Sequence, residues 1–366
     1  MNKTIWRIIK KWILLAGIVA VMLSAILVFI TRFTPKPVVW LLRRVFDKPP
    51  KKPLEAIQPK AIQPKEAQEK AVAPQDDQEK AINIKDIQPK SIQEIENIHY
   101  GQEAKEVLDL YVPVEEGKYP VILWIHGGAF VGGDKKDVLY FARELTKQGY
   151  AVAAINYALA PESQYPRPIL QTNKAYEFLV KGDYLEKEKI DTRQIFLAGD
   201  SAGAFIAAQC VLLQSNEVYR QAFIKRENLL EMPKVNYRGV LLYCGPYLLA
   251  ETNDIRSPLV SFLTRQVQWA YWGEKNFALS EHSAEIDVIK YAKRGWPPTF
   301  ITDGNTFSFA SHGKALAKQL KKEGVEVDEL FFDNEEKVVH EYQFDLSSKA
   351  GEKALRKTLR FLGEYS

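Results

Sequence analysis

The sequence predicts an α/β fold in which a mostly parallel central sheet is flanked by helices. From residue 98 onward, short apolar runs alternate with segments of helical periodicity, which is typical of such a sheet. The runs at 121–125 and 195–199 are apolar without alternation, as expected for strands that are buried on both faces. Both runs lead into glycines, which favour a tight turn where the strand ends.

Each element is predicted from its local pattern. Strands are expected at 107–113, 121–128, 151–157, 195–199, 239–245, 298–304 and 327–333. Helices are expected at 137–148, 169–181, 201–213, 311–323 and 348–363. Residues 248–295 break this alternation, and we interpret them as a helical insertion over the site. Its aromatic side chains, Trp269, Tyr271 and Trp272 with the neighbouring Trp296, either contact a substrate or only pack in the core.

The amino terminus predicts a membrane anchor. Residues 12–30 are apolar and carry no charge, and about 20 such residues cross a bilayer. The run is longer than the apolar core of a cleavable signal peptide, so we expect a single-pass transmembrane helix in the cell membrane. Basic residues nearly balance on its two sides, which leaves open the side of the membrane on which the rest of the chain lies. Residues 40–46 predict either a short amphipathic turn on the membrane surface or the start of a linker.

The rest of the chain divides into a linker and one domain. After the anchor and juxtamembrane segment at 1–46, residues 47–97 are rich in Pro, Gln and Lys, and "AIQPK" occurs at 56–60 and again at 61–65. Regular prolines prevent a continuous helix, so we expect a semi-extended spacer. Residues 98–366 form the predicted globular domain, and we expect a chain that starts near residue 95 to be soluble and to keep its function.

Composition excludes several classes of function. The formal net charge is only +4 and the lysines are dispersed, so no nucleic-acid partner is expected. The two cysteines, Cys210 and Cys244, lie in apolar runs and predict buried free thiols. No CxxC or paired-histidine motif accompanies them, so we expect neither a metal site nor a cofactor.

The motif "GDSAG" at 199–203 gives the sharpest functional prediction. It places Ser201 between a predicted strand and a predicted helix, with a glycine two residues away on either side. A strained turn at this position exposes the hydroxyl, and the helix behind it offers its positive dipole end and free N–H groups to a developing negative charge. A helix N-cap is the structural alternative for Ser201, but it does not explain the glycines.

A second motif, "HGGAF" at 126–130, follows another predicted strand. Its small residues let the backbone bend and direct several N–H groups at one point. Such donors stabilise the oxyanion of an acyl-transfer reaction by about 3–4 kcal/mol each. An ordinary turn is the alternative interpretation.

With "YALAPESQYP" at 157–166, these motifs give a family resemblance over residues 98–366. The chain resembles the α/β-hydrolase esterases and lipases of the hormone-sensitive-lipase-like branch. The resemblance implies that Ser201 is the nucleophile and that Gly128, Ala129 and Ala202 supply the amides of the oxyanion hole. Two positions depart from the family pattern, since Ala129 replaces its third glycine and Ala158 replaces its usual arginine.

His340 is the predicted general base. It is one of five histidines, and it lies after the last predicted strand and before the last helix. In this fold the order along the chain is nucleophile, acid, histidine, which fits this position. An imidazole there can accept the serine proton and return it to the leaving group. A solvated loop histidine is the alternative.

The acid partner of the histidine stays open in the sequence. The family places an aspartate where "ITDGNTFSF" has Phe307, so no carboxylate is carried over from the resemblance. Asp303, at the end of the predicted strand, is the first candidate. The other candidates follow the next strand or act without charge, and they are Asp333, Glu335, Glu336 and Asn305. A Ser–His pair without an acid is the remaining alternative.

Together these features predict a membrane-anchored serine hydrolase that cleaves carboxylic esters, with a small-molecule or lipid ester as substrate. Two alternatives stay open: a catalytically weak hydrolase fold that binds a ligand, and a peptidase or amidase of the same fold. The missing family aspartate motivates the first of these alternatives.

Overall fold

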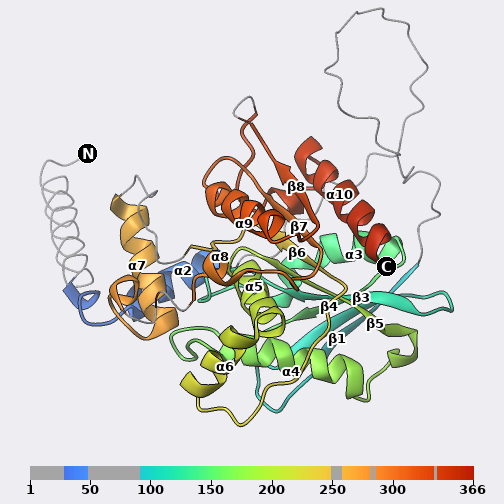
Figure 1. The fold of residues 1–366 in the computed structure, drawn as a ribbon, viewed down its shortest axis with the longest axis horizontal. Helices are drawn as coiled ribbons and strands as arrows, with labels where there is room; N and C mark the ends of the chain where they lie inside the picture. Colours follow the sequence, from blue (N-terminus) through green and yellow to red (C-terminus); the bar gives the residue numbers. More distant parts are fainter. Residues whose placement is uncertain (1–28, 48–90, 249–257, 281–282, 284–285, 334–335) are drawn as a thin grey trace, which may run out of the picture.

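The computed structural model describes residues 29–47, 91–248, 258–280, 283, 286–333 and 336–366 (Figure 1). Most of the predicted membrane span, residues 12–28, therefore lies outside the described residues, and so do 48–90 of the predicted linker. Among the helices that the structure describes, none is both long enough and apolar enough to cross a membrane.

One eight-stranded sheet runs through the molecule, in the order β1-β2-β4-β3-β5-β6-β7-β8. In this spatial order every neighbouring pair from β4 through to β8 is parallel. At the other edge, β1 pairs antiparallel with β2, and β2 pairs antiparallel with β4. The strands are β1 (Ile92–His99), β2 (Val107–Pro113), β3 (Tyr119–Ile125), β4 (Ala151–Ile155), β5 (Ile190–Asp200), β6 (Gly239–Tyr243), β7 (Thr299–Asp303) and β8 (Val327–Phe331).

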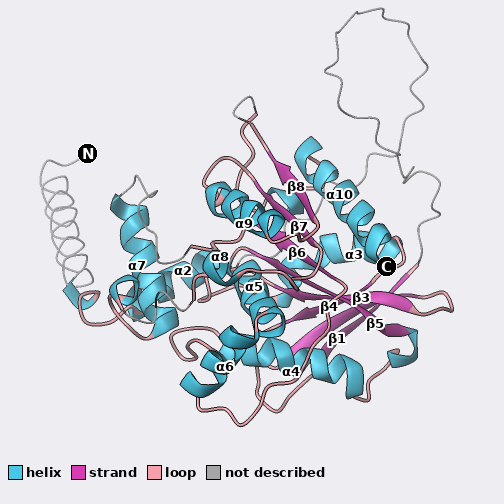
Figure 2. Ribbon diagram, viewed as in Figure 1, coloured by secondary structure: helices cyan, strands magenta, loops and turns pink. Residues whose placement is uncertain are grey.

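Helices cover both faces of this sheet (Figure 2). One face packs on α3 (Leu139–Lys147) and α10 (Lys349–Tyr365), and the other on α4 (Arg167–Lys181), α5 (Ala202–Ser215), α6 (Glu217–Arg226), α8 (Val288–Tyr291) and α9 (Ala310–Lys322). Residues 121–125 of β3 and 195–200 of β5 are buried, which explains why these apolar runs do not alternate. The predicted α/β-hydrolase architecture is confirmed.

Strand β1 corrects the predicted domain boundary. The sequence places residues up to 97 in the linker, but Ile92–His99 pairs antiparallel with β2 at the edge of the sheet. Its side chains are only partly buried, because an edge strand has a neighbour on one side only. The ordered domain therefore includes residues that were predicted to be a spacer, and a chain that starts at residue 95 would lose part of β1.

Helix α2 (Lys36–Phe46) corrects the prediction for the juxtamembrane segment. Instead of a short turn, residues 36–46 form a helix that packs against α7 (Pro258–Trp272). Val38 and Val39 are buried, and Phe46 lies over the backbone of Gly132. Figure 1 shows α2 beside α7, on the side of the molecule where the chain begins. Helix α2 is thus part of the folded domain.

The predicted insertion is built around α7, and its aromatic residues pack. Tyr271 is buried and stacks on Phe130 with 3.9 Å between ring centroids. Trp272 stacks on Phe277 at 4.1 Å, and Trp296 is buried. Packing is therefore the role that the structure gives to these three side chains. Through Phe130, the insertion is attached to the "HGGAF" loop.

The inner face of α2 provides a test of its place in the domain. Val39→Asp puts a carboxylate at a position that is 2% exposed, which carries a large desolvation cost. We expect hydrogen exchange to speed up in α2 and in residues 128–133 beneath it. Val45→Asp is the matched control, because Val45 lies on the same helix and is 52% exposed. Equal protection of α2 in both variants would contradict the packing described.

Candidate active site

Ser201 lies at a strained turn between β5 and α5. Its backbone has φ 50° and ψ −114°, which a non-glycine residue rarely adopts. A Cβ at Gly203 would lie 2.0 Å from the carbonyl oxygen of Ile125, so only glycine lets α5 approach β3 this closely. This approach fixes the turn and leaves the hydroxyl of Ser201 partly exposed, as predicted for a nucleophile on such a turn.

His340 is brought to Ser201 by the loop that follows β8. Its Nε2 lies 2.9 Å from Oγ of Ser201, within hydrogen-bonding distance. The backbone N–H of His340 donates to the carbonyl of Thr306 at 3.1 Å, and Val339 forms a bridge with Thr306. The loops after β7 and β8 thus hold each other, and this pairing positions the imidazole.

Asp303 faces the other nitrogen of the same imidazole. Its Oδ1 lies 3.6 Å from Nδ1 of His340, slightly beyond a hydrogen bond. The carboxylate is 1% exposed and accepts backbone N–H bonds from Gly304 and Phe309, both at 2.7 Å. Buried Nδ1 has no hydrogen-bond partner within the described part of the chain, so Asp303 is the nearest acceptor available to it.

The charges around His340 favour its protonated form. Burial lowers the pKa of the imidazole, but the nearby carboxylate of Asp303 and the charge of Glu341 outweigh this, and the pKa is raised overall. Glu341 Oε1 lies 4.0 Å from Nε2 of His340. The site therefore stabilises the imidazolium that forms when a serine proton is transferred to this ring.

The other candidates for the acid lie elsewhere. Phe307, at the family's aspartate position, is 88% exposed and has positive φ. Asn305 donates to the carbonyls of Asp333 and Glu336 and accepts the N–H of Val338, so it fastens the loop before His340. Glu335 lies outside the described residues. Of the described candidates, Asp303 is the one whose carboxylate the structure pairs with His340.

The three predicted oxyanion amides belong to two adjacent segments. Gly128 and Ala129 have φ of +105° and +52°, and a Cβ at Gly128 would lie 2.2 Å from the carbonyl of Gly132. Ala202 is the first residue of α5, where backbone N–H groups lack intrahelical partners. Within the described part of the chain, the N–H groups of Gly128, Ala129 and Ala202 have no protein acceptor. They are therefore free to bind an anionic oxygen.

Asp200, next to the serine, is a supporting residue that the sequence interpretation missed. Its fully buried carboxylate accepts the indole N–H of Trp124 and the backbone N–H of Gly127, both at 2.8 Å. Burial and the charge of Glu341 raise the pKa of Asp200 well above its usual value. The residue ties the turn of Ser201 to the start of the "HGGAF" loop. Its position inside the "GDSAG" motif is the sequence signal that could have indicated this role.

Arg43 of α2 is a second contact that was missed. Its guanidinium donates to the carbonyls of Val131 and Ala160, both at 2.8 Å, and to Glu162. This ion pair lowers the pKa of Glu162. The "YALAPE" segment lacks the family's usual arginine at 158, and here a guanidinium from α2 binds the same segment. No local pattern in the sequence connects residues 117 positions apart.

One cluster has the donor types of a metal site. Atoms of Cys244, Asp303 and His340 lie within 4.8 Å of one another. Cys244 is buried and accepts the N–H of Glu341 at 3.3 Å, and burial raises the pKa of its thiol well above the usual value. Because metals bind the thiolate, this protonated thiol is a poor ligand. The cluster fits proton transfer at His340 better than a metal ion. Cys210 is likewise buried and free, as predicted.

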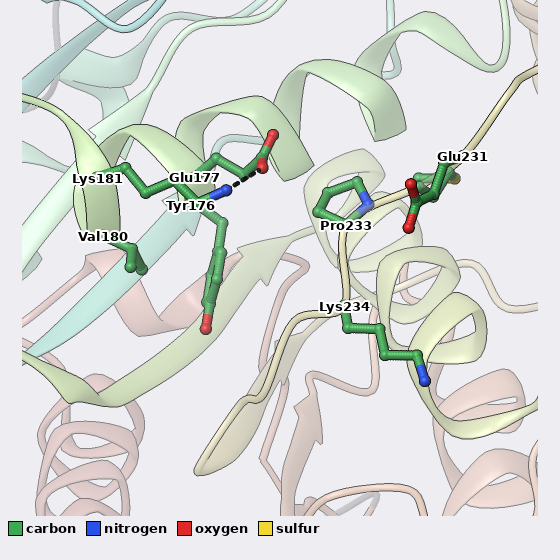
Figure 3. Close-up of a pocket in the computed structure, with 8 residues that line it drawn as sticks. Tyr176, Glu177, Val180, Lys181, Glu231, Pro233 and Lys234 are labelled. Carbon is green, nitrogen blue, oxygen red and sulfur yellow. Dashed lines mark hydrogen bonds and ion pairs between the residues drawn. The ribbon is translucent and has the colours of Figure 1, made fainter.

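Two surface pockets lie away from Ser201. The first, of about 500 Å³, lies between α4 and residues 231–234. In Figure 3, Glu177 and Lys181 form an ion pair at its edge, opposite Pro233. The second, of about 650 Å³, lies between α2 and the segments 132–134 and 158–167. Neither pocket is lined by Ser201 or His340.

Comparison with known proteins places the chain in a family. The BD-FAE family matches residues 108–319, which include Ser201 and Asp303. The chain belongs to this family. The chain is also similar to "Probable isoprenylcysteine alpha-carbonyl methylesterase ICME" of Oryza sativa subsp. japonica. The two sequences are 34% identical over 127 residues, which cover 34% of this chain and 30% of that protein.

A receptor and a solved esterase show the same likeness. "Gibberellin receptor GID1A" of Arabidopsis thaliana is 33% identical over 114 residues, 30% of this chain and 33% of the receptor. The chain therefore matches about a third of the length of these curated relatives. Esterase B from Lactobacillus rhamnosis, solved with an inhibitor, has a TM-score of 0.63 at 20% identity, and the match covers 76% of this chain and 88% of that one. The predicted relationship to the α/β-hydrolase esterases is confirmed.

The charge of Glu341 gives a testable shift at His340. Glu341→Gln removes one group that stabilises the imidazolium, so the pKa of His340 should fall while Ser201 and Asp303 stay in place. NMR titration of the His340 imidazole measures this directly. Glu336→Gln is the matched control and should leave the titration unchanged. An unchanged or higher pKa in Glu341→Gln would contradict the electrostatic role of Glu341.

Proposed function

We propose that the protein is a serine hydrolase that cleaves carboxylic esters through an acyl-enzyme on Ser201. The observation that carries this proposal is the 2.9 Å contact between Oγ of Ser201 and Nε2 of His340. It occurs on a strained turn beside three backbone N–H groups that have no acceptor within the described residues. A nucleophile, a base and an oxyanion site are thus supplied by neighbouring segments.

Each step follows from these groups. Oγ of Ser201 attacks the ester carbonyl carbon while Nε2 of His340 takes the hydroxyl proton. The carbonyl oxygen becomes negative and is bound by the N–H groups of Gly128, Ala129 and Ala202, and loss of one such donor costs about 10²–10³ in turnover. His340 returns the proton to the departing alcohol. Water then attacks the acyl-enzyme by the same path and releases the acid.

Asp303 is the proposed acid of this site. Its two backbone hydrogen bonds hold the carboxylate at the end of β7. A closure of a few tenths of an ångström brings the 3.6 Å contact within hydrogen-bonding distance of Nδ1, and catalytic hydrogen bonds are often long without substrate. The carboxylate then fixes the tautomer that leaves Nε2 free to accept a proton. An exposed phenylalanine at 307 leaves no competing carboxylate at the family position.

A ligand-binding protein without catalysis is the second candidate. It is favoured by the long contact to Asp303 and by the receptor among the curated relatives. The intact turn at Ser201 and the paired His340 favour the hydrolase instead, because ligand binding alone does not need either of them. An amidase of the same fold would use the same groups, and substrate assays with esters and anilides distinguish the two.

We also propose that the protein is anchored in a membrane. It is supported by the charge-free run at 12–30, which has the length of a membrane span and ends shortly before α2 begins at Lys36. The proposed substrate is a small-molecule or lipid ester, and no nucleic acid is expected to bind. The catalytic domain lies on one side of the cell membrane, with α2 as its first helix.

Ser201→Ala tests the nucleophile. A fluorophosphonate probe should label the wild-type protein at Ser201 and leave the variant unlabelled, and hydrolysis of p-nitrophenyl esters should fall by at least about 10³-fold. Ser308→Ala is the control for loss of a nearby hydroxyl. Circular dichroism should show the same fold for all three proteins. Labelling of Ser201→Ala at the wild-type level, or ester hydrolysis by that variant at the wild-type rate, would contradict the assignment of Ser201 as the nucleophile.

A further inference from the structure

Helix α2 carries apolar side chains that the domain buries and others that it leaves exposed. Val38 and Val39 face the domain and are buried. In contrast, Trp40, Leu41 and Val45 are 59%, 51% and 52% exposed, and we call these three residues the outer face of α2. A surface helix of a globular protein typically has one apolar stripe, which faces the core of its own domain. Contiguous apolar side chains that stay exposed instead mark a surface that binds a partner or a membrane.

Exposed apolar side chains continue toward the amino terminus from the outer face. Phe29, Ile30 and Phe33 are 57%, 39% and 69% exposed, and the rings of Phe29 and Phe33 contact each other. Six of the fifteen large exposed apolar side chains in the described part of the chain thus fall within residues 29–45. This concentration distinguishes the segment from scattered surface apolar residues, which need no explanation.

The charges along the same segment have one sign. Helix α2 contains Lys36, Arg43 and Arg44 and no acidic residue, and Arg32 precedes it. Arg43 is bound to Glu162, whereas Arg44 lies over the ring of Trp40 at 4.4 Å. Tryptophan beside basic side chains is typical of helices that lie in the headgroup region of a membrane. Basic residues near the surface also attract anionic lipids, by about 1 kcal/mol each.

The place of α2 in the chain puts this surface near a bilayer. The apolar run that predicts a membrane span ends at residue 30, and α2 begins at Lys36. The intervening residues reach at most about 20 Å even when fully extended. An anchored chain therefore cannot hold α2 far from the membrane surface. A lipid surface is the occupant that apolar area, positive charge and chain connectivity all favour.

We infer that the outer face of α2, extended by Phe33, lies in the headgroup region of the membrane. There α2 joins the membrane to the catalytic site, because Arg43 on its inner side binds the carbonyl of Val131 in the loop that carries the oxyanion amides. That loop then lies about one helix diameter, 10–12 Å, from the lipid surface. The inference rests on the proposed membrane anchor, and it does not require ester hydrolysis.

Fluorescence quenching tests this placement in the full-length protein. Leu41→Cys and Val218→Cys each place one reactive thiol on an exposed helical position, since Cys210 and Cys244 are buried. Val218, in α6, is 73% exposed and is the matched control. Each variant carries a bimane label and is reconstituted into phosphatidylcholine–phosphatidylglycerol vesicles, with retention after an alkaline wash showing that the span is inserted. Lipids with a nitroxide near the headgroup and aqueous iodide serve as the two quenchers.

We expect the lipid nitroxide to quench the label at 41 at least about threefold more than the label at 218, and iodide to show the opposite order. Equal iodide quenching at the two positions would overturn the inference, because the outer face would then be in water. Protection of position 41 from both quenchers would also overturn it, since a second copy or another part of the chain would then cover α2. If the protein gives the expected quenching but has no esterase activity, only the proposed ester hydrolysis is refuted.

Discussion

The close approach of α5 to β3 is the constraint on which the site depends. At Gly203 the backbone of α5 lies so near the carbonyl of Ile125 that any side chain would collide with it. This contact forces the strained turn that exposes Ser201, and it sets the turn beside the loop that follows β3. The nucleophile and the oxyanion amides are therefore neighbours because two buried strands are neighbours, with β3 and β5 paired in parallel.

Buried carboxylates perform different tasks around this turn. Asp200 is buried next to the serine, and burial and the charge of Glu341 raise its pKa. Its carboxylate accepts hydrogen bonds from the indole N–H of Trp124 and the backbone N–H of Gly127. Asp303 faces the histidine instead and is held by backbone N–H groups. The first residue builds the scaffold and the second faces the reacting groups. Their environments separate these roles, although both residues end a strand of the same sheet.

Local sequence patterns predicted the sheet, the covering helices, and the serine and histidine that the structure brings together. These features depend on periodicity and on motifs a few residues long. What was missed depends on distant parts of the chain. Asp303 was the first candidate for the acid, but the mutual pairing of the loops after β7 and β8, which brings His340 near it, cannot be read from either loop alone. The apolar pattern of α2 was recognised, but its burial against α7, more than 200 residues away, was not.

The substitution Asp303→Asn tests the central claim most directly. We expect ester turnover to fall by a factor of about 10²–10⁴, because asparagine cannot stabilise the imidazolium of His340. The pKa of His340 should fall as well, since Asp303 raises it. Asp333→Asn, in the loop after β8, is the matched control and should retain activity. A folded Asp303→Asn protein with wild-type turnover would contradict the assignment of Asp303, and so would a gain of activity in Phe307→Asp.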